Sequence, residues 1–132
     1  MIQLQKGAHC VYQLEYHLVW CPHWREACLT EKIGTTVYRE ILSACRNNQM
    51  IVQQLNVQSD HVHLCVVIPP SLCVSDAIGL IKSKSSWALG SNRFGKRSWS
   101  RGYFASSVGI DDETVKKYIS TQGRRETMYS NS

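Results

Sequence analysis

The sequence predicts an α+β protein in which helices cover one face of a small antiparallel sheet, the ferredoxin-like or RRM-like arrangement, with a further helix at its C-terminal end. The apolar spacing alternates between period two and helical periods in the order β-α-β-β-α-β-α. Its 132 residues, 43% hydrophobic and 19% charged, are typical of one folded domain and exclude a multidomain enzyme. We expect a single domain over residues 1–132, with a core from about 11 to 122 and a polar tail over 123–132.

The first half of the chain contains a strand, a helix and a hairpin. Residues 11–21 predict a strand, because their large apolar side chains recur at every second position. Residues 30–48 predict an amphipathic helix with apolar side chains at i, i+4 spacing. Residues 51–58 and 61–68 flank a two-residue turn and predict a hairpin.

The second half of the chain predicts a helix, a loop, a short strand and a last helix. Residues 74–89 predict a helix that ends at Gly90, and the Gly-, Ser- and Arg-rich segment 91–102 predicts a loop. A short strand is expected near 103–108. A last helix then starts after Asp111 and Asp112, whose carboxylates suit a helix N-terminus, and extends at least to residue 122.

Charge and cysteine content narrow the class of protein. The net charge of +5 permits a polyanionic partner. No run of 18 apolar residues and no signal-peptide pattern occurs, so we expect a cytoplasmic protein without a membrane partner. The six cysteines are then expected to be reduced. Cys21, His23 and Cys28 hint at zinc, but a fourth ligand at the usual spacing is missing.

Two histidines in the predicted hairpin are candidate metal ligands. His61 and His63 stand two positions apart in an extended segment, so both side chains project from the same face and two imidazoles can converge on one ion. The alternative is that two polar residues occupy the open face of a half-buried sheet.

The last predicted helix offers a nucleophile and a third ligand. Tyr118 and Gln122 stand at i and i+4 on one helix face. A phenol is protonated at neutral pH and needs a metal or a base to attack a phosphate, whereas the Gln carbonyl oxygen can complete coordination without adding charge. The alternative places Tyr118 in the core beside Val115 and Ile119.

Basic residues gather in an interval between residues 79 and 105 that holds no acidic residue and is interleaved with five aromatic residues. Positive charge follows phosphates and aromatic rings stack on unpaired bases, so this composition predicts a surface for single-stranded nucleic acid. The alternative is a solvated loop with ordinary core aromatics. The candidate DNA-binding residues, including two lysines just before the tyrosine, are Lys82, Lys84, Arg93, Lys96, Arg97, Arg101, Lys116 and Lys117.

From about Tyr12 to Gln122 the chain resembles the single-tyrosine HUH transposases, the small transposases of bacterial and archaeal insertion sequences. Four segments carry the resemblance in the same order: Tyr16-His17-Leu18-Val19-Trp20, Asp60-His61-Val62-His63-Leu64 followed by Pro69-Pro70, Trp99-Ser100-Arg101-Gly102-Tyr103-Phe104, and Val115-Lys116-Lys117-Tyr118-Ile119-Ser120-Thr121-Gln122.

The resemblance implies a function and a site. His61, His63 and Gln122 would hold a divalent ion, Mg²⁺ or Mn²⁺, and Tyr118 would cut single-stranded DNA through a 5′-phosphotyrosine intermediate. Such enzymes work as homodimers on subterminal DNA hairpins without a nucleotide cofactor. Two other functions fit the same residues: a repeat-associated tyrosine transposase, or a non-cutting module that binds hairpin DNA.

Overall fold

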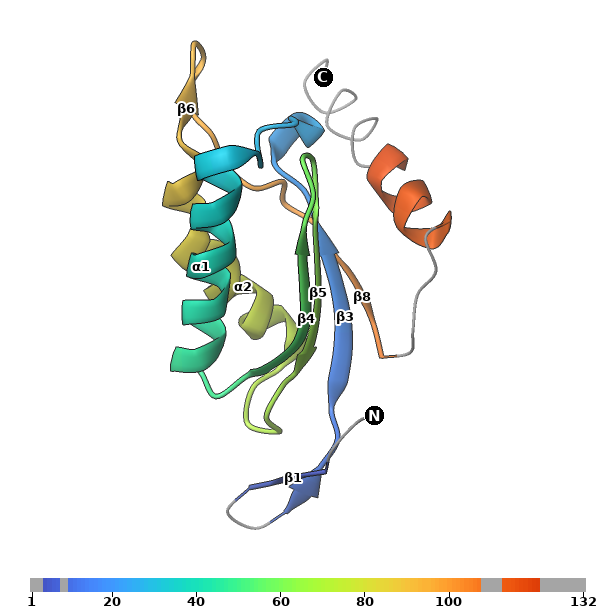
Figure 1. Cartoon of the computed structure of the whole chain (residues 1–132). Coiled ribbons are helices and arrows are strands. Elements are labelled where there is room, and N and C mark those ends of the chain that lie inside the picture. Colours follow the sequence, from blue (N-terminus) through green and yellow to red (C-terminus); the bar gives the residue numbers. More distant parts are fainter. Residues whose placement is uncertain (1–3, 8–9, 108–112, 122–132) are drawn as a thin grey trace.

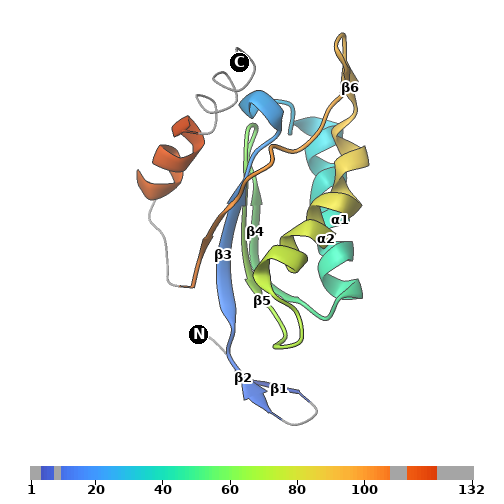
Figure 2. The ribbon, with the colours of Figure 1, turned by 180° about the vertical axis from the view of Figure 1, so that it is seen from behind.

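The computed structural model describes residues 4–7, 10–107 and 113–121. Four antiparallel strands form its main sheet in the order β4-β5-β3-β8. Helices α1 (Glu31–Asn47) and α2 (Val74–Ser85) cover one face, as Figures 1 and 2 show from opposite sides. The helix of residues 113–121, which we call the tyrosine helix, lies over the other face. The predicted α+β class is therefore confirmed.

The central pair of strands divides apolar from polar side chains. Strand β3 (Glu15–Trp20) pairs with β5 (Val62–Val67), with Leu18 opposite Leu64. Successive side chains of a strand point to opposite faces, so Leu18, Leu64 and Trp20 all face α1 and α2, where they are fully buried. The alternation in residues 11–21 correctly predicted this core face.

The predicted hairpin is confirmed. Strand β4 (Ile51–Val57) pairs with β5 along its length, with a bulge between Val52 and Gln54. On the other edge, β8 (Phe104–Ser106) pairs with β3 and supplies the short strand expected near residues 103–108.

Helix α1 also forms where the sequence predicts it. Its buried stripe includes Val37, Ile41 and Cys45, the residues of the i, i+4 pattern. A Cβ at Gly34 would lie 2.8 Å from the carbonyl oxygen of Leu29, so only glycine fits in this first turn.

The strand predicted over residues 11–21 is divided. Residues Val11–Tyr12 form β2 and pair with β1 (Gln5–Lys6) in a separate ribbon, while β3 begins at Glu15. The β3–β5 ladder ends beyond Ile68, whose N–H donates to the Leu14 carbonyl. The following Pro69 and Pro70 have no N–H to donate, so the ladder cannot continue toward residue 11.

The helix predicted over 74–89 is an α-helix only up to residue 85. Helix α2 stops at Ser85 and the chain continues as a 3₁₀ turn, η2 (Ser86–Leu89), up to Gly90, whose φ of +76° favours glycine. The predicted loop 91–102 contains a small ribbon, β6 (Ser91–Asn92) and β7 (Gly95–Lys96), which projects from the molecule in Figure 1.

The tyrosine helix packs through its own small apolar cluster. Val115 and Ile119 are buried against Val19 of β3 and Cys21, on the face opposite α1 and α2. This cluster is separate from the main core, so the helix is attached to the sheet by few apolar contacts. Gln122 and the tail 123–132 lie outside the described residues.

The six cysteines are all free, in agreement with the expectation of reduced thiols. Cys21 packs under the tyrosine helix while Cys28 belongs to the main core, so the two lie in different clusters. The structure thus gives no support to a zinc site built on Cys21, His23 and Cys28. Within the part of the chain that the structure describes, no helix combines the length and apolar character needed to cross a membrane.

Lys82 anchors the segment that leads into β8. Its Nζ donates to the carbonyl oxygens of Ser100 (2.7 Å) and Gly102 (2.9 Å). Burial of the ammonium lowers the pKa of Lys82 from 10.5 to about 8. The lysine therefore holds the loop between η2 and β8 against α2 at the cost of a desolvated charge.

Replacing Lys82 by Met keeps the apolar stem but removes these hydrogen bonds, and we expect the free energy of unfolding at neutral pH to fall by about 1–3 kcal/mol. Between pH 8 and 10.5 the unfolded chain binds the Lys82 proton more tightly than the folded chain. The wild type should therefore gain stability as the pH rises through this window, relative to Lys82→Met. Urea unfolding of both proteins at about pH 7 and pH 9.5 measures the difference. Parallel pH dependence of the two proteins would contradict this account of Lys82.

Candidate active site

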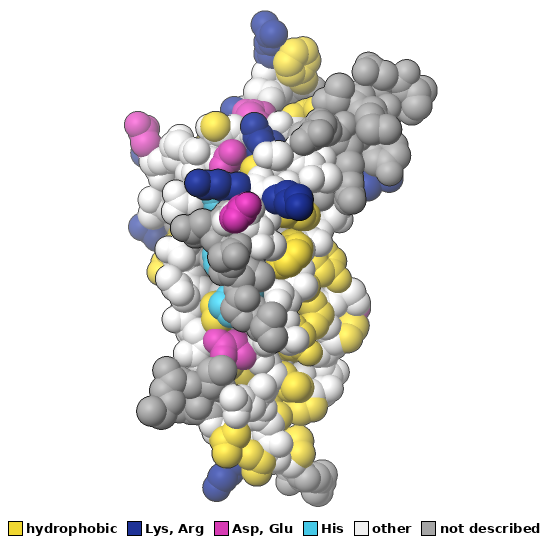
Figure 3. Space-filling model, turned by 90° about the vertical axis from the view of Figure 1, so that its right-hand side faces the viewer, with side chains coloured by type: hydrophobic (Ala, Val, Ile, Leu, Met, Phe, Trp, Pro, Cys, Tyr) yellow, Lys and Arg dark blue, Asp and Glu magenta, His cyan; other side chains and the backbone are white. Residues whose placement is uncertain are grey.

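One face of the sheet carries polar, titratable side chains, and we call it the histidine face. The same alternation that buries Leu18 and Leu64 turns Glu15, His17 and Val19 of β3 to this side. In β5 it turns His63 and Cys65 the same way, with His63 opposite Val19 and Cys65 opposite His17. Figure 3 faces this side of the molecule and shows histidine side chains reaching the surface between acidic and basic ones.

His61 is oriented by a carboxylate. It precedes β5 by one residue, so the alternation places it on the histidine face with His63. Its Nδ1 lies 2.9 Å from Oδ1 of Asp60, and Nε of Arg25 lies 3.7 Å from Oδ2 of the same carboxylate. An ionised carboxylate only accepts, so Nδ1 of His61 is the donor, and in the neutral ring Nε2 then carries the lone pair. This is the arrangement in which a histidine ligand is usually held for a metal ion.

His63 has a neighbour that the sequence motif did not indicate. Its Nε2 lies 3.4 Å from Nδ1 of His17, and the two ring centroids are 5.7 Å apart. Both rings are half-buried. The row of imidazoles on the sheet therefore extends from β5 onto β3, beyond the two histidines of the hairpin.

Tyr118 lies on the same face of the sheet. Its ring packs on the cluster that contains Val19, the residue directly opposite His63 in the ladder. The ring centroid of Phe104 in β8 is 5.9 Å from that of Tyr118, and the phenol oxygen is buried. The packing beside Val115 and Ile119, which the sequence analysis gave as the alternative to a chemical role, therefore attaches Tyr118 to the histidine face of the sheet.

A second group of ligand-type side chains adjoins the histidines. The ligand atoms of Glu15, His17 and Cys65 all lie within 4.8 Å of one another. Cys65 Sγ donates to Oε1 of Glu15 at 2.7 Å and lies 3.8 Å from Nε2 of His17. Burial, together with the hydrogen bond and negative charge of Glu15, raises the pKa of the Cys65 thiol to about 12.

A period-two pattern in the sequence also marks Glu15, His17 and Cys65. His61, His63 and Cys65 follow period two in the segment predicted as a strand over 61–68, and Glu15 and His17 occupy the alternate positions of a strand whose other side is apolar. The polar side of each strand thus carries a pattern of its own beside the apolar one. The pairing of Cys65 with His17 requires the strand register, which the sequence did not supply.

The predicted DNA-binding residues differ in the structure: three of them contact other groups of the protein. Lys82, Lys84 and Arg97 contact protein groups: Lys82 binds carbonyls, Lys84 Nζ lies 4.0 Å from Glu40, and Arg97 Nε donates to Glu26 at 2.6 Å. Lys84 is nevertheless exposed, as are the remaining residues of the set: Arg93, Lys96, Arg101, Lys116 and Lys117. Arg93 and Lys96 belong to the projecting ribbon, whereas Lys116 and Lys117 lie on the tyrosine helix, on the other side of the sheet.

The interleaved aromatics are divided in the same way. Trp99 is only 8% exposed, contacts Trp20 edge-on and donates from Nε1 to Ser85 in the core. Phe94, at the tip of the ribbon, is 83% exposed, with the Arg93 guanidinium 4.8 Å from its ring centroid. Trp87 is 56% exposed. Trp87 and Phe94 are therefore the members of this set that offer open faces for stacking.

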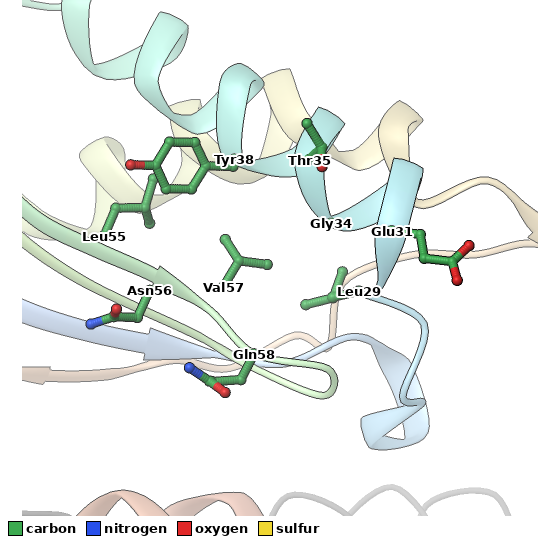
Figure 4. A pocket seen from close by; sticks show the side chains of 9 residues that line it. All are labelled: Leu29, Glu31, Gly34, Thr35, Tyr38, Leu55, Asn56, Val57 and Gln58. Atoms are coloured by element: carbon green, nitrogen blue, oxygen red, sulfur yellow. The ribbon is translucent and has the colours of Figure 1, made fainter.

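A pocket of about 500 Å³ lies between α1 and the edge strand β4 (Figure 4). Tyr38 and Glu31 line it from α1, and Leu55 and Val57 line it from the sheet. It holds no histidine or cysteine, and its lining includes none of the predicted site residues. The chemistry-bearing groups are on the histidine face instead.

These features agree with comparison to known proteins. Residues 10–122 match the family model described as "Transposase IS200 like". That match covers most of the chain and every described site residue. The protein thus belongs to the single-tyrosine IS200-like transposase family, whose members act on DNA.

Individual relatives agree with the family. The chain is 28% identical over 128 residues to the transposase for insertion sequence element IS200 of Salmonella typhimurium, covering 92% of this chain and 84% of that one. It is 27% identical over 133 residues to the ISDra2 transposase TnpA of Deinococcus radiodurans, covering 95% of each chain.

Solved structures share the fold. A transposase structure from Deinococcus radiodurans R1 superposes with a TM-score of 0.77 at 23% identity, over 89% of this chain and 97% of that chain. A REP-associated tyrosine transposase bound to a REP hairpin gives a TM-score of 0.58 at 13% identity, over 87% and 68%.

Proposed function

We propose that this transposase cuts and rejoins single-stranded DNA at insertion-sequence ends, with Tyr118 as nucleophile and a divalent ion, Mg²⁺ or Mn²⁺, held by His61, His63 and Gln122. The observation that supports it most is the position of the tyrosine helix. Tyr118 packs against the apolar cluster that contains Val19, the direct ladder neighbour of His63, although 55 residues separate tyrosine from histidine in the chain.

The described residues fit a metal ion. Asp60 accepts from Nδ1 of His61, so that Nε2 faces away from the carboxylate, and His63 stands two positions further along the chain on the same face of the sheet. Gln122, the third ligand of the proposal, follows directly on the described tyrosine helix. When bound, the ion would polarise the scissile phosphate and stabilise the leaving oxygen.

The tyrosine supplies the covalent step of the proposal. The Tyr118 oxygen attacks phosphorus, a bond from that oxygen to phosphorus forms, and the bond from phosphorus to the 3′ oxygen breaks. The phenol loses its proton and the 3′ oxygen gains one, so the products are a 5′-phosphotyrosine and a free 3′-OH. Strand transfer reverses these steps with another 3′-OH, and no nucleotide cofactor is needed because one phosphodiester replaces another.

The exposed basic residues suggest how DNA is bound. Arg93 and Lys96 on the ribbon, with the open face of Phe94, suit an unpaired or terminal base beside phosphates. Lys116 and Lys117 place positive charge beside Tyr118. In the proposal, two copies of the chain join through their sheets, and this homodimer binds a subterminal DNA hairpin. Each tyrosine would then have a defined strand to cut.

Tyr118→Phe should abolish the covalent adduct while leaving DNA binding intact, because the ring that packs on Phe104 is kept and only the hydroxyl is lost. Wild type and variant are incubated with single-stranded DNA from both ends of the gene's own locus, with Mg²⁺ or EDTA, and run on a denaturing protein gel. Wild type should give a metal-dependent shifted band.

The matched control is Tyr103→Phe, since Tyr103 packs against the main core and not on the histidine face. This variant should form the adduct like wild type. An adduct in Tyr118→Phe would refute the assignment of the nucleophile. Hairpin binding by wild type with no adduct under any condition would instead indicate a non-cutting DNA-binding module.

Asp60→Asn should raise the Mg²⁺ concentration needed for half-maximal adduct formation by about 10–100-fold, because the neutral amide no longer holds His61 as a carboxylate does. His61→Ala should lose the reaction altogether. Adduct yield is measured across an Mg²⁺ titration, with the exposed Asp76→Asn, in the first turn of α2, as the control. An unchanged titration for Asp60→Asn would show that the Asp60 carboxylate does not support metal binding, and adduct formation by His61→Ala would remove His61 from the metal site.

Substituting Arg93 and Lys96 together by Ala should reduce the slope of log K against log salt for single-stranded DNA by about 0.7 for each phosphate that these side chains neutralise. Lys6→Ala is the comparison, because Lys6 is exposed on the separate β1–β2 ribbon at the far end of the molecule. Fluorescence anisotropy from about 50 to 200 mM salt measures the slopes. Equal slopes for all three proteins would remove the ribbon from the DNA interface.

A further inference from the structure

Beside the proposed catalytic histidines, the histidine face holds a second set of ligands of different chemistry. We propose that Glu15, His17 and Cys65 form a separate metal site that takes a borderline-soft divalent ion such as Zn²⁺. The inference concerns metal binding alone and does not depend on DNA cleavage.

Strand register brings the three side chains together. Cys65 and His17 are direct partners in the antiparallel β3–β5 ladder, and Glu15 is two positions from His17 on the same side. Such direct and diagonal neighbours are within reach of one another on one sheet face. The ligand atoms consequently lie within 4.8 Å of one another, which is the scale of a single coordination sphere.

The distances suit tetrahedral coordination with a small change in one side chain. Zinc bonds of about 2.3 Å to sulfur and about 2.0–2.1 Å to nitrogen place the two ligand atoms about 3.6 Å apart. Sγ of Cys65 lies 3.8 Å from Nε2 of His17. Oε1 of Glu15, now an acceptor 2.7 Å from Sγ, would move back by about 1 Å, which its partly exposed side chain allows.

The chemistry of the three ligands determines which metal ion the site prefers. A thiolate, an imidazole and one carboxylate oxygen are preferred by Zn²⁺ or Co²⁺, whereas Mg²⁺ prefers oxygen ligands in an octahedron. On binding, the Cys65 thiol proton leaves to solvent and the sulfur bonds to the metal. Three protein ligands leave the fourth tetrahedral position to water. Glu15 and His17 are only partly buried, so an ion can reach the site from solvent.

His17 lies between the two proposed metal sites and contacts a ligand of each of them. Its Nε2 faces Cys65 while its Nδ1 lies 3.4 Å from His63, so it could instead serve as a third imidazole beside His63. Sulfur in the coordination sphere distinguishes the two arrangements, because the sulfur of Cys65 contacts His17 and Glu15, and Cys65 lies two residues from His63 along β5.

The test is a titration of the full-length, reduced protein with Co²⁺ as a spectroscopic substitute for zinc, in excess Mg²⁺ and without DNA. We expect a thiolate-to-cobalt charge-transfer absorption at one equivalent that added Zn²⁺ removes. Cys65→Ser should abolish this band, whereas Cys73→Ser, which alters an exposed thiol, and His61→Ala should retain it. Glu15→Gln should need at least about tenfold more Co²⁺ because it loses the charged ligand.

Several outcomes would overturn the proposal. These are the absence of a sulfur band in wild type, an equal band in Cys65→Ser, or a band that disappears in His61→Ala. Far-ultraviolet circular dichroism checks the fold of each variant, and Glu15→Gln, at a partly exposed position, keeps the test decisive if Cys65→Ser does not fold. Because neither DNA nor adduct formation is measured, failure of the proposed transposase chemistry leaves this result unaffected.

Discussion

The antiparallel pairing of β3 with β5 is the constraint on which the rest of the molecule depends. Its register sets Leu18 against Leu64 on one face and Val19 against His63 on the other. A shift of one residue would exchange the two faces, exposing the core and burying the histidines. The packing of α1 and α2 on the apolar face is therefore what keeps the polar face in place.

The two faces of the sheet differ in how many apolar contacts they make with the helices that cover them. The main core joins both helices to the sheet through many fully buried side chains, whereas the tyrosine helix joins the sheet through a cluster of four buried residues, two of which belong to the helix itself. The scaffold that carries the histidines is thus independent of the element that carries Tyr118. In the proposed mechanism, this division would leave the histidines in place if Tyr118 moved together with a DNA strand bonded to it.

The histidine face also shows why polar residues in one sheet can serve separate roles. His61 is oriented by Asp60 at the hairpin, His63 contacts His17 across the strands, and Cys65 lies one row further along. Each step of two residues along β5 changes the neighbours that a ligand meets. If both proposed metal sites form, a metal preferring oxygen and nitrogen and one preferring sulfur would be bound on the same face without sharing a coordination sphere.

The sequence by itself determined the order of the main elements, the apolar stripes of β3 and α1, and the motifs that hold His61, His63 and Tyr118, because these depend on local periodicity and spacing. It did not determine that Trp99 is core and Phe94 exposed, that Lys82 binds carbonyls, or that His17 and Cys65 meet. Those facts depend on contacts between residues far apart in the chain. They were decided only when strand register and packing fixed which side chains share a face.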